Sequence, residues 1–575
     1  MTETDRQGEA PATGRSREDS ERRRHRTAFW RALFVWLVAI GLLAGAMGCA
    51  VTEDDLRRWE TTQEGPRRLR AVVLSKKYPY AMRVQAALAL IRMKPRKGQR
   101  VGIKELVENT LAKLDPDVRG KIVADLVPLM IQELKREVPP AQAGQPAPPD
   151  PSFPIKDAAY MMLTFERTSQ GGTTIVADPA LRRDLEKALT DWAMADFERR
   201  LNDRSQAYGM EQLLRYIGPS SAVGIPKLMT KNAKSLTTMA DLVAKLGDDA
   251  TKEEGGKRLV EVAEYIASDQ WRTEKKPELE EANRKAMVEP TDKQFEAQLV
   301  SYQDETLMRV FGSMKQVGGH AVVDYCLRFA GDKAQADKRR NAALAALEGR
   351  IPRDDPVIIE RVLAIASSEP PDIVMDQVFR RIRELPRDKV VDKVYDLFKT
   401  DKWKIRRAAG ATLLQMSTVK HIDEFMRHLS EKATKNFSLG EAMTYGAYLG
   451  DLKEGNVRDA LRPHMDRGLA QARLAAIGYY FTYGTKNDLP AVAPFEEDKT
   501  KIPKCDEEAK CAWECEVAKE GDPNGRENKE VKTVGDFVKF CVEPQMLQNQ
   551  AKPKDDKPGA PKDQKEGTDE QGQSP

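Results

Sequence analysis

A short motif that recurs along the chain constrains its fold more than any other feature of the sequence. In each copy, a base is followed by an alanine three positions later and by a large apolar residue seven positions later. Residues at this spacing lie on one face of an α-helix. The copies are Arg83, Ala86 and Leu90; Lys156, Ala159 and Leu163; Arg340, Ala343 and Leu347; Arg406, Ala409 and Leu413; Arg473, Ala476 and Tyr480; and, with isoleucine in place of alanine, Arg119, Ile122 and Leu126.

The spacing of the copies matches the length of a helical hairpin. The spacings are 36 and 37 residues between Arg83, Arg119 and Lys156. They are 66 and 67 residues, about two periods, between Arg340, Arg406 and Arg473. A single hairpin cannot bury its apolar face, so hairpins that repeat in this way must stack on one another. The sequence therefore predicts an all-α fold, an α-solenoid of stacked helical hairpins.

Within the motif, the alanine and the base have different expected roles. A small side chain lets the neighbouring helix approach closely. The base lies near the loop before its helix, and acidic residues precede two of the copies, at Asp115 and at Asp401. We expect these acids to cap the helix N-terminus and to pair with the base of the adjacent repeat.

Two segments carry a resemblance to the HEAT-repeat family, Asp401 to Leu414 and Arg83 to Leu90. The family pattern is an aspartate, then Val-Arg, then paired alanines, then leucine; these segments match it well and the other copies match it in part. The tetratricopeptide family has a similar period, but its Trp and Gly-x-x-Tyr positions do not recur here. The resemblance implies a protein-binding scaffold, and with the N-terminus described next the chain resembles a bacterial HEAT-repeat lipoprotein.

The N-terminal region has the charge pattern of an export signal. Residues 1–31 are polar, are expected to be disordered and end in a basic stretch; an uncharged apolar run, 32–51, follows, and acidic residues come directly after it. This order predicts that the rest of the chain is exported into the periplasm of a bacterial cell envelope. Two forms of attachment stay open. One is a lipid on Cys49, which would favour the outer membrane, and the other is an uncleaved transmembrane helix over the apolar run.

Composition divides the remainder of the chain into segments. HEAT-like repeats are expected over 52–138 and 155–500, separated by a proline-rich loop, 139–154. The highly charged stretch 270–305 is expected to form long exposed helices that connect two halves of the array. The tail, 551–575, is rich in charged residues, Gln, Gly and Pro and is expected to be disordered.

Residues 501–550 hold most of the cysteines. Zinc sites usually place two pairs of ligands at gaps of two to four residues, and only Cys511 and Cys515 approach that pattern, so disulfide bonds are favoured over a metal site. In an exported protein an even local set instead predicts two disulfide bonds. The four residues are Cys505, Cys511, Cys515 and Cys541.

A disulfide-linked helical cap at the end of the solenoid is the expected structure of this segment. We expect one helix over 506–520, a loop over 521–531 and a second helix that starts with a capping box of Thr533 and Asp536. In an antiparallel hairpin of this kind, the end of the second helix faces the early part of the first. That geometry favours the pair Cys511–Cys541 and leaves Cys505–Cys515.

Charge and motif searches exclude several classes of function. The chain has 94 Lys and Arg residues against 90 Asp and Glu, a balance that argues against nucleic-acid binding. No phosphate-binding loop, zinc-protease motif or serine-hydrolase motif occurs, and no metal-ligand pattern is evident. We therefore expect a non-enzymatic scaffold without catalytic residues, metal or cofactor that binds an unidentified envelope protein. The alternative is an envelope enzyme, or a lyase-like HEAT protein, with an unrecognised active site.

Overall fold

The computed structural model of the chain describes residues 51–96, 99–138, 150–168, 172–203, 206–431, 437–466, 469–502, 513–519 and 525–549. The chain folds into two compact units, and the boundary between them lies after Ile217. This boundary falls inside the expected repeat segment 155–500.

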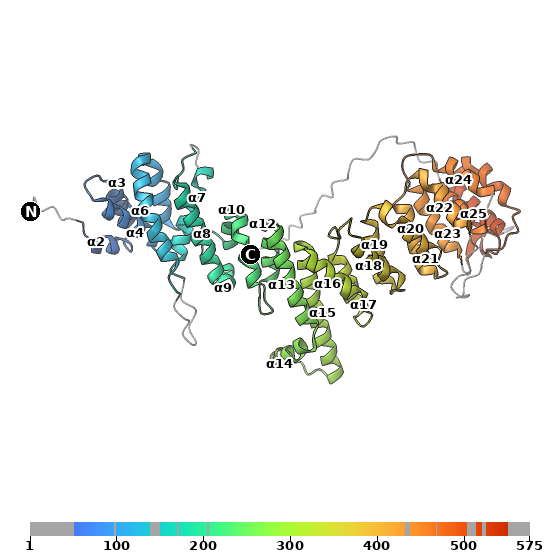
Figure 1. The fold of residues 1–575 in the computed structure, drawn as a ribbon, viewed down its shortest axis with the longest axis horizontal. Coiled ribbons are helices and arrows are strands. Elements are labelled where there is room, and N and C mark those ends of the chain that lie inside the picture. The colour runs from blue at the N-terminus through green and yellow to red at the C-terminus, as the bar shows by residue number, and fades with distance from the viewer. Residues whose placement is uncertain are drawn as a thin grey trace, which may run out of the picture. The chain divides into compact units, whose positions relative to one another are not determined.

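The first unit is a stack of helical hairpins. Its helices are α2 (Glu53–Trp59), α3 (Gly65–Leu74), α4 (Tyr80–Arg92), α5 (Val101–Val107), α6 (Pro116–Leu134), α7 (Phe153–Thr168), α8 (Pro179–Ala195), α9 (Phe197–Asn202) and α10 (Met210–Ile217). Helices α4, α6 and α8 pack in one row, and α3, α5 and α7 pack in a second row against it. Figure 1 shows these helices following one another in chain order.

The second unit continues the helical pattern and ends in a small hairpin of strands. Its elements are α11 (Pro219–Ala222), α12 (Leu236–Leu246), α13 (Asp249–Ala267), α14 (Asp269–Lys285), α15 (Asp292–Val317), α16 (His320–Gly331), α17 (Asp337–Ala346), α18 (Pro356–Ser367), α19 (Asp372–Arg383), α20 (Arg387–Phe398), α21 (Trp403–Gln415), α22 (Ile422–Glu431), α23 (Leu439–Gly450), α24 (Val457–Asp466), α25 (Ala470–Tyr483), α26 (Leu489–Val492), β1 (Glu514–Ala518), β2 (Arg526–Glu530), α28 (Val534–Phe537), a π-helical turn η6 (Val538–Val542) and α29 (Glu543–Gln548).

Two rows of helices also form the second unit. Helices α17, α19, α21, α23 and α25 pack on one another in that order, and α16, α18 and α20 form the row behind them. Successive helices α16 and α17, α18 and α19, and α20 and α21 are packed as hairpins. The predicted α-solenoid is therefore confirmed for the part of the chain that the structure describes, with the short strands near the C-terminus as the exception.

Several helices begin where the sequence places an Asp-Pro pair. The side chains of Asp115, Asp178 and Asp355 accept backbone N–H groups of the first turns of α6, α8 and α18, and each is followed by the proline that starts the helix. The aspartate supplies an acceptor to N–H groups that have no partner in the helix, and proline needs none. The expected capping role of Asp115 is thus confirmed. Asp401 does not have this role, because α21 starts after Lys402 without a side-chain cap.

The motif bases bind the end of the preceding helix. Arg83 donates from Nε to the carbonyl oxygen of Val73 at 2.7 Å, and Arg340 does the same to Ala330 at 2.8 Å; each acceptor lies in the last turn of the helix before. Both arginines are buried. The carbonyl groups at a helix C-terminus have no partner within the helix and carry partial negative charge, so a buried cation is stabilised there. The expected pairing with an acid of the adjacent repeat is wrong for these two copies.

The remaining bases have varied partners. Arg119 donates to the carbonyl of Leu114 at 3.4 Å, and Lys156 pairs with Asp157 at 2.7 Å. Arg473 pairs with Asp498. The apolar positions of the motif are uniformly buried, with Ala86, Leu90, Ala159, Ala343, Ala409, Leu413 and Ala476 all inside the core. The alanines therefore lie where neighbouring helices pack, as the motif predicts.

The cysteine segment differs from the expected helical hairpin. Residues 514–518 form β1, which pairs antiparallel with β2 and places Cys515 opposite Lys529. Cys515 forms a disulfide with Cys541 in η6, with the Cα atoms 5.5 Å apart. The expected pairs Cys511–Cys541 and Cys505–Cys515 are thus both wrong, because a strand and not a helix carries Cys515 against the helical turn. Cys505 and Cys511 lie outside the described residues.

The second expected helix of this segment is present. Thr533 and Asp536 form the predicted capping box at the start of α28. The polar and apolar alternation of Glu514, Cys515, Glu516 and Val517 matches the strand, in which Cys515 and Val517 are less exposed than the two glutamates. That alternation was the sequence signal for β1.

The N-terminal segments 1–31 and most of 32–51, with Cys49, lie outside the described residues, as does the tail 551–575. None of the helices over the described residues is both long and apolar enough to span a membrane. In the proline-rich segment, the structure describes residues from Asp150 onward. There Asp150 and Ser152 are buried and Phe153 already begins α7.

Candidate functional site

Three successive helices of one row enclose a groove in the second unit. We name it the α19–α21–α23 groove, and its volume is about 340 Å³. Its walls combine aliphatic, aromatic and charged side chains. It is lined by Asp372, Met375 and Asp376 from α19, by Trp403, Lys404, Arg407, Ala408 and Ala411 from α21, and by Thr444 and Tyr448 from α23.

Exposed apolar side chains occur at the starts of two of the helices that form this groove. Trp403 at the start of α21 is 38% exposed, and Ile373 at the start of α19 is 49% exposed. An ion pair joins the same two helix ends, with Lys404 Nζ 2.8 Å from Asp372 Oδ1. This pair joins the starts of α19 and α21, and of the two exposed apolar residues Trp403 lines the groove while Ile373 follows the lining residue Asp372 in the sequence.

The charges of the groove do not favour one sign. Asp372 and Lys404 neutralise each other, while Asp376 and Arg407 are exposed on the walls. Arg383, at the end of α19, lies near Tyr448 and Asp376, and burial lowers its pKa. The surface therefore offers apolar contact together with single charges of both signs, which suits a protein segment better than a highly charged ligand.

A buried ion pair between α21 and α23, two of the helices that form the groove, fixes their spacing. Arg406 donates from Nε and Nη2 to the two carboxylate oxygens of Glu441, at 2.7 and 2.9 Å. Tyr445 donates to the same carboxylate at 2.7 Å. Burial raises the pKa of the Tyr445 hydroxyl far above its usual value, so it remains a hydrogen-bond donor. Burial alone would lower the pKa of Arg406, but Glu441 outweighs it and the pKa is raised.

Glycines let the helices of this row approach closely. A Cβ at Gly410 would lie 2.4 Å from the ring of Tyr445, so this glycine makes room for the tyrosine of the buried ion-pair cluster. A Cβ at Gly446 in α23 would lie 2.3 Å from the backbone of Gly478 in α25. The close packing of α21, α23 and α25 thus requires glycine at positions where a Cβ would clash with the neighbouring helix.

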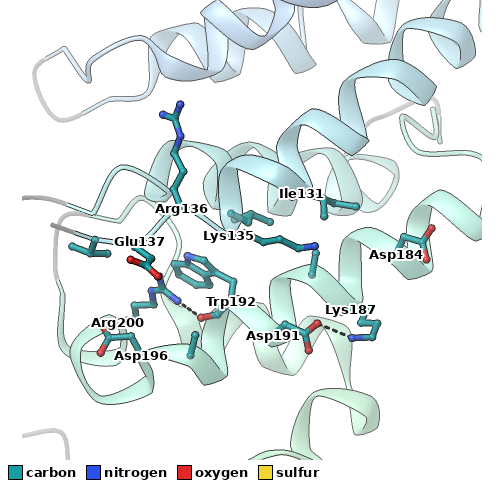
Figure 2. A pocket seen from close by; sticks show the side chains of 14 residues that line it. Ile131, Lys135, Arg136, Glu137, Asp184, Lys187, Asp191, Trp192, Asp196 and Arg200 are labelled. Atoms are coloured by element: carbon teal, nitrogen blue, oxygen red, sulfur yellow. Dashed lines mark hydrogen bonds and ion pairs between the residues drawn. The ribbon is translucent and has the colours of Figure 1, made fainter.

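A larger groove lies in the first unit, between the end of α6 and α8, with a volume of about 900 Å³. Figure 2 shows Trp192 and Arg200 at one end and the paired Lys187 and Asp191 on the α8 rim. On the α6 side its lining ends at Val138, directly before residues 139–149, which lie outside the described part of the chain.

The floor of that groove is a buried polar network. Asp150 Oδ2 accepts hydrogen bonds from Arg199 at 2.8 Å and from Arg200 at 3.0 Å, and Trp192 donates from its indole nitrogen to Ser152 at 2.7 Å. The Arg200 guanidinium also lies over the Trp192 ring, 4.4 Å from its centroid. These groups use their bonding capacity on one another, so they anchor the start of α7 on α8 and α9 and offer little to a ligand.

No group of three or more His, Cys, Asp and Glu side chains that could hold a metal ion occurs among the described residues. Two histidines, His428 and His464, pair with Glu431 and Asp423 at 3.0 and 2.7 Å. Cys326 is buried, and burial raises the pKa of its thiol. A buried thiol with a raised pKa is a poor nucleophile.

Sequence reasoning found the positions that pack the repeats but not the residues of the groove. The motif placed Arg406 and Ala409 on the inner face of α21, whereas Trp403, Lys404 and Arg407 occupy the other faces of the same helix. Trp403 lies within the segment that carries the HEAT resemblance, but the repeat motif assigns it no role. Its signal was a large aromatic residue at the exposed start of a helix whose apolar positions were already assigned to the core.

Of three comparisons with known proteins, the one with solved structures gave matches. No family model matches the sequence, and no curated protein matches it. Among solved structures, the chain is similar to one from a study of how Kap95p binding induces the switch loops of RanGDP to adopt the GTP-bound conformation, with 12% identity, coverage of 77% of this chain and 58% of that chain, and a TM-score of 0.18. It is also similar to a Kap121p mutant, with 11% identity, coverage of 85% and 60%, and a TM-score of 0.20. The chain spans less than two thirds of the length of either.

Proposed function

We propose that this chain is a non-enzymatic helical-repeat scaffold that binds a partner protein at the α19–α21–α23 groove. The observation that carries the proposal is the exposure of Trp403 on the wall of a groove that three successive helices share, with Ile373 exposed directly after the lining residue Asp372 in the sequence. Protein interfaces concentrate their affinity in a few large side chains, with tryptophan and arginine prominent among them. The buried pair Arg406–Glu441 fixes α21 against α23, so the surface is preformed, which lowers the entropic cost of binding.

Replacing Trp403 with alanine is expected to weaken partner binding by about tenfold or more, because the anchor side chain is lost. The partner is first identified by a photoactivatable cross-linking residue placed at Ile373. The dissociation constant of the purified partner is then measured by titration calorimetry for the full-length wild-type chain and the variant.

The matched control is Val357→Ala. Val357 is 65% exposed at the start of α18, in the row behind the groove, so its loss is expected to change affinity by less than about twofold. The proposal fails if Trp403→Ala and Val357→Ala have the same effect, or if a partner cross-linked at Ile373 binds the Trp403 variant as tightly as the wild type.

We further propose that the chain is exported and attached to the bacterial envelope through residues 32–51. The charge order around this apolar run supports export, and the Cys515–Cys541 disulfide fits an oxidising compartment. The scaffold would then face the periplasm. These supports do not distinguish a lipid on Cys49 from an uncleaved helix.

Replacing Cys49 with serine separates the two forms of attachment. If Cys49 is lipidated, intact-mass measurement of the wild-type membrane fraction is expected to show a chain that starts at Cys49 with added acyl mass, and the variant retains Met1. If the helix is uncleaved, both proteins retain Met1 and carry no acyl mass. Recovery of the wild-type chain in the cytosol with Met1 intact would reject export itself.

A further inference from the structure

One helical hairpin of the second unit has no core of its own. We name residues 272–298, from the first turn of α14 through the start of α15, the arm. Trp271 and Leu299 are buried on either side of it, but no side chain within the arm is buried. Figure 1 shows α14 lying away from the rows that contain α16 to α25. The arm is therefore a side branch of the solenoid and not the connector between two halves that the sequence predicts.

Polar contacts hold the arm together. Asn283 Nδ2 donates to Gln298 Oε1 at 3.0 Å across the two helices. At the base, Arg272 donates to Gln303 at 2.9 Å. The ion pairs of Glu281 with Arg284 and Lys285 stay within α14 and do not join the helices. The helical stretches within the arm, 272–285 and 292–298, bury no side chain, so by themselves they are only marginally stable and a further surface would stabilise this hairpin.

The tip of the arm presents apolar side chains in a fixed geometry. Met287 is 91% exposed and Val288 is 47% exposed. Met287 has a φ of +54°, in the left-handed region that normally favours glycine. Two backbone hydrogen bonds hold this turn, from Met287 to Arg284 at 3.1 Å and from Val288 to Asn283 at 2.9 Å. Met287 is thus exposed in a backbone conformation that glycine would adopt at a lower free-energy cost.

A cleft of about 500 Å³ lies beside these side chains. Met287 and Val288 form one side of it, and Phe295 of α15 lies within it. Lys276 and Glu280, of opposite charge, also line it, and the Lys276 ammonium lies 5.9 Å from the centre of the Phe295 ring. The same small region therefore carries both a projecting apolar group and a recess with an apolar wall.

The charge of the arm identifies the kind of partner that fits. The arm contains six Lys and Arg residues and seven Asp and Glu residues, interspersed along both helices. An anionic membrane surface or a strongly acidic protein would require a basic excess, which is missing. A balanced mosaic is instead complementary to itself when two copies meet about a two-fold axis, because acids of one copy can face bases of the other.

We propose that the arm is a self-association site whose occupant is the arm of a second copy of this chain. Two hairpins pair into a four-helix bundle, and Met287, Val288 and Phe295 of both copies form its core. The projecting methionine of each copy enters the cleft of the other. The pairing supplies the buried surface that the arm lacks alone.

The test is the association state of the full-length chain. Sedimentation velocity is expected to show a concentration-dependent monomer–dimer equilibrium, and Met287→Asp is expected to raise its dissociation constant by about tenfold or more. Because Met287 is almost fully exposed, this change does not disturb the monomer. The control is Val223→Asp, at an apolar position 61% exposed outside the arm, which should leave the equilibrium unchanged.

Hydrogen exchange localises the contact. Backbone amides of residues 276–298 are expected to exchange more slowly as the protein concentration rises, and to lose this protection in the Met287→Asp variant. A chain that stays monomeric up to about 100 µM overturns the proposal, since weaker pairing has no specific role at ordinary concentrations. So does a dimer in which the arm gains no protection, or one that both aspartate variants dissociate equally.

Discussion

Replacing Glu441 with alanine is expected to lower the free energy of unfolding of the second unit by about 3–5 kcal/mol, because it leaves a buried cation without its counter-charge. Arg406 is fully buried and reaches both oxygens of this carboxylate. Arg406 also donates to the backbone carbonyl oxygen of Thr400 at 3.1 Å, which carries no formal charge. Tyr445 loses the shorter of its two hydrogen bonds in the same change and keeps the one to the carbonyl oxygen of Arg406 at 3.1 Å. The loss should loosen α21 from α23 and, with them, the α19–α21–α23 groove.

Native-state hydrogen exchange of the α21 and α23 amides measures this effect, because it gives local free energies in a chain of two units that need not unfold together. The control is Glu360→Ala. Glu360 and Lys393 form an exposed ion pair at 3.6 Å, so its loss should cost less than about 1 kcal/mol. If both variants lost the same free energy of unfolding, burial would not determine how much the Arg406–Glu441 pair contributes to stability.

Replacing Gly446 with alanine is expected to destabilise the second unit by about 1–3 kcal/mol or more, because the added methyl group has no space. Its Cβ would meet three backbone atoms of Gly478 and Tyr479 between 2.3 and 2.6 Å away. Backbone cannot turn aside as a side chain can, so α23 and α25 must separate. Thermal unfolding followed by circular dichroism should show a lower midpoint for the transition of this unit.

Gly312→Ala is the matched control for this change. Gly312 is also a helical glycine of the second unit, but a Cβ there meets nothing within 4 Å. Alanine at an open helical position is expected to stabilise by about 0.5–1 kcal/mol, because the unfolded chain loses conformational freedom. The two substitutions should therefore shift stability in opposite directions. A gain in both would show that α23 and α25 can separate without cost.

The repeat could be predicted because its signal is local. The bases and alanines of the motif lie within one or two turns of a helix, and the buried alanines Ala86, Ala343 and Ala409 occupy the positions that the motif assigns to them. The partner of each base could not be predicted in the same way. Whether Arg83 meets a carbonyl or a carboxylate depends on where the preceding helix ends, and in this chain it ends against the arginine.

The cysteine pairing shows the same limit of sequence-based prediction, here for residues that are farther apart in the chain. The capping box of Thr533 and Asp536 is a contact between near neighbours and was predicted correctly. The partner of Cys541 was not, because Cys515 comes close to it only after β1 and β2 have paired. A five-residue strand with mixed polar and apolar residues competes closely with a helix until its partner strand is present.

The amino-acid order alone was sufficient to determine that the chain builds stacked helical hairpins, since periodicity, capping and small residues act within a few turns of helix. Only the tertiary structure decided which side chains share a surface. Met375, Trp403 and Tyr448 line one groove but come from three helices, and Met287 is exposed because none of the described elements of the unit covers the tip of the arm. Such groupings depend on how closely and at what angle the helices pack. A substitution at Gly446 can change that packing, because a Cβ there would meet the backbone of α25.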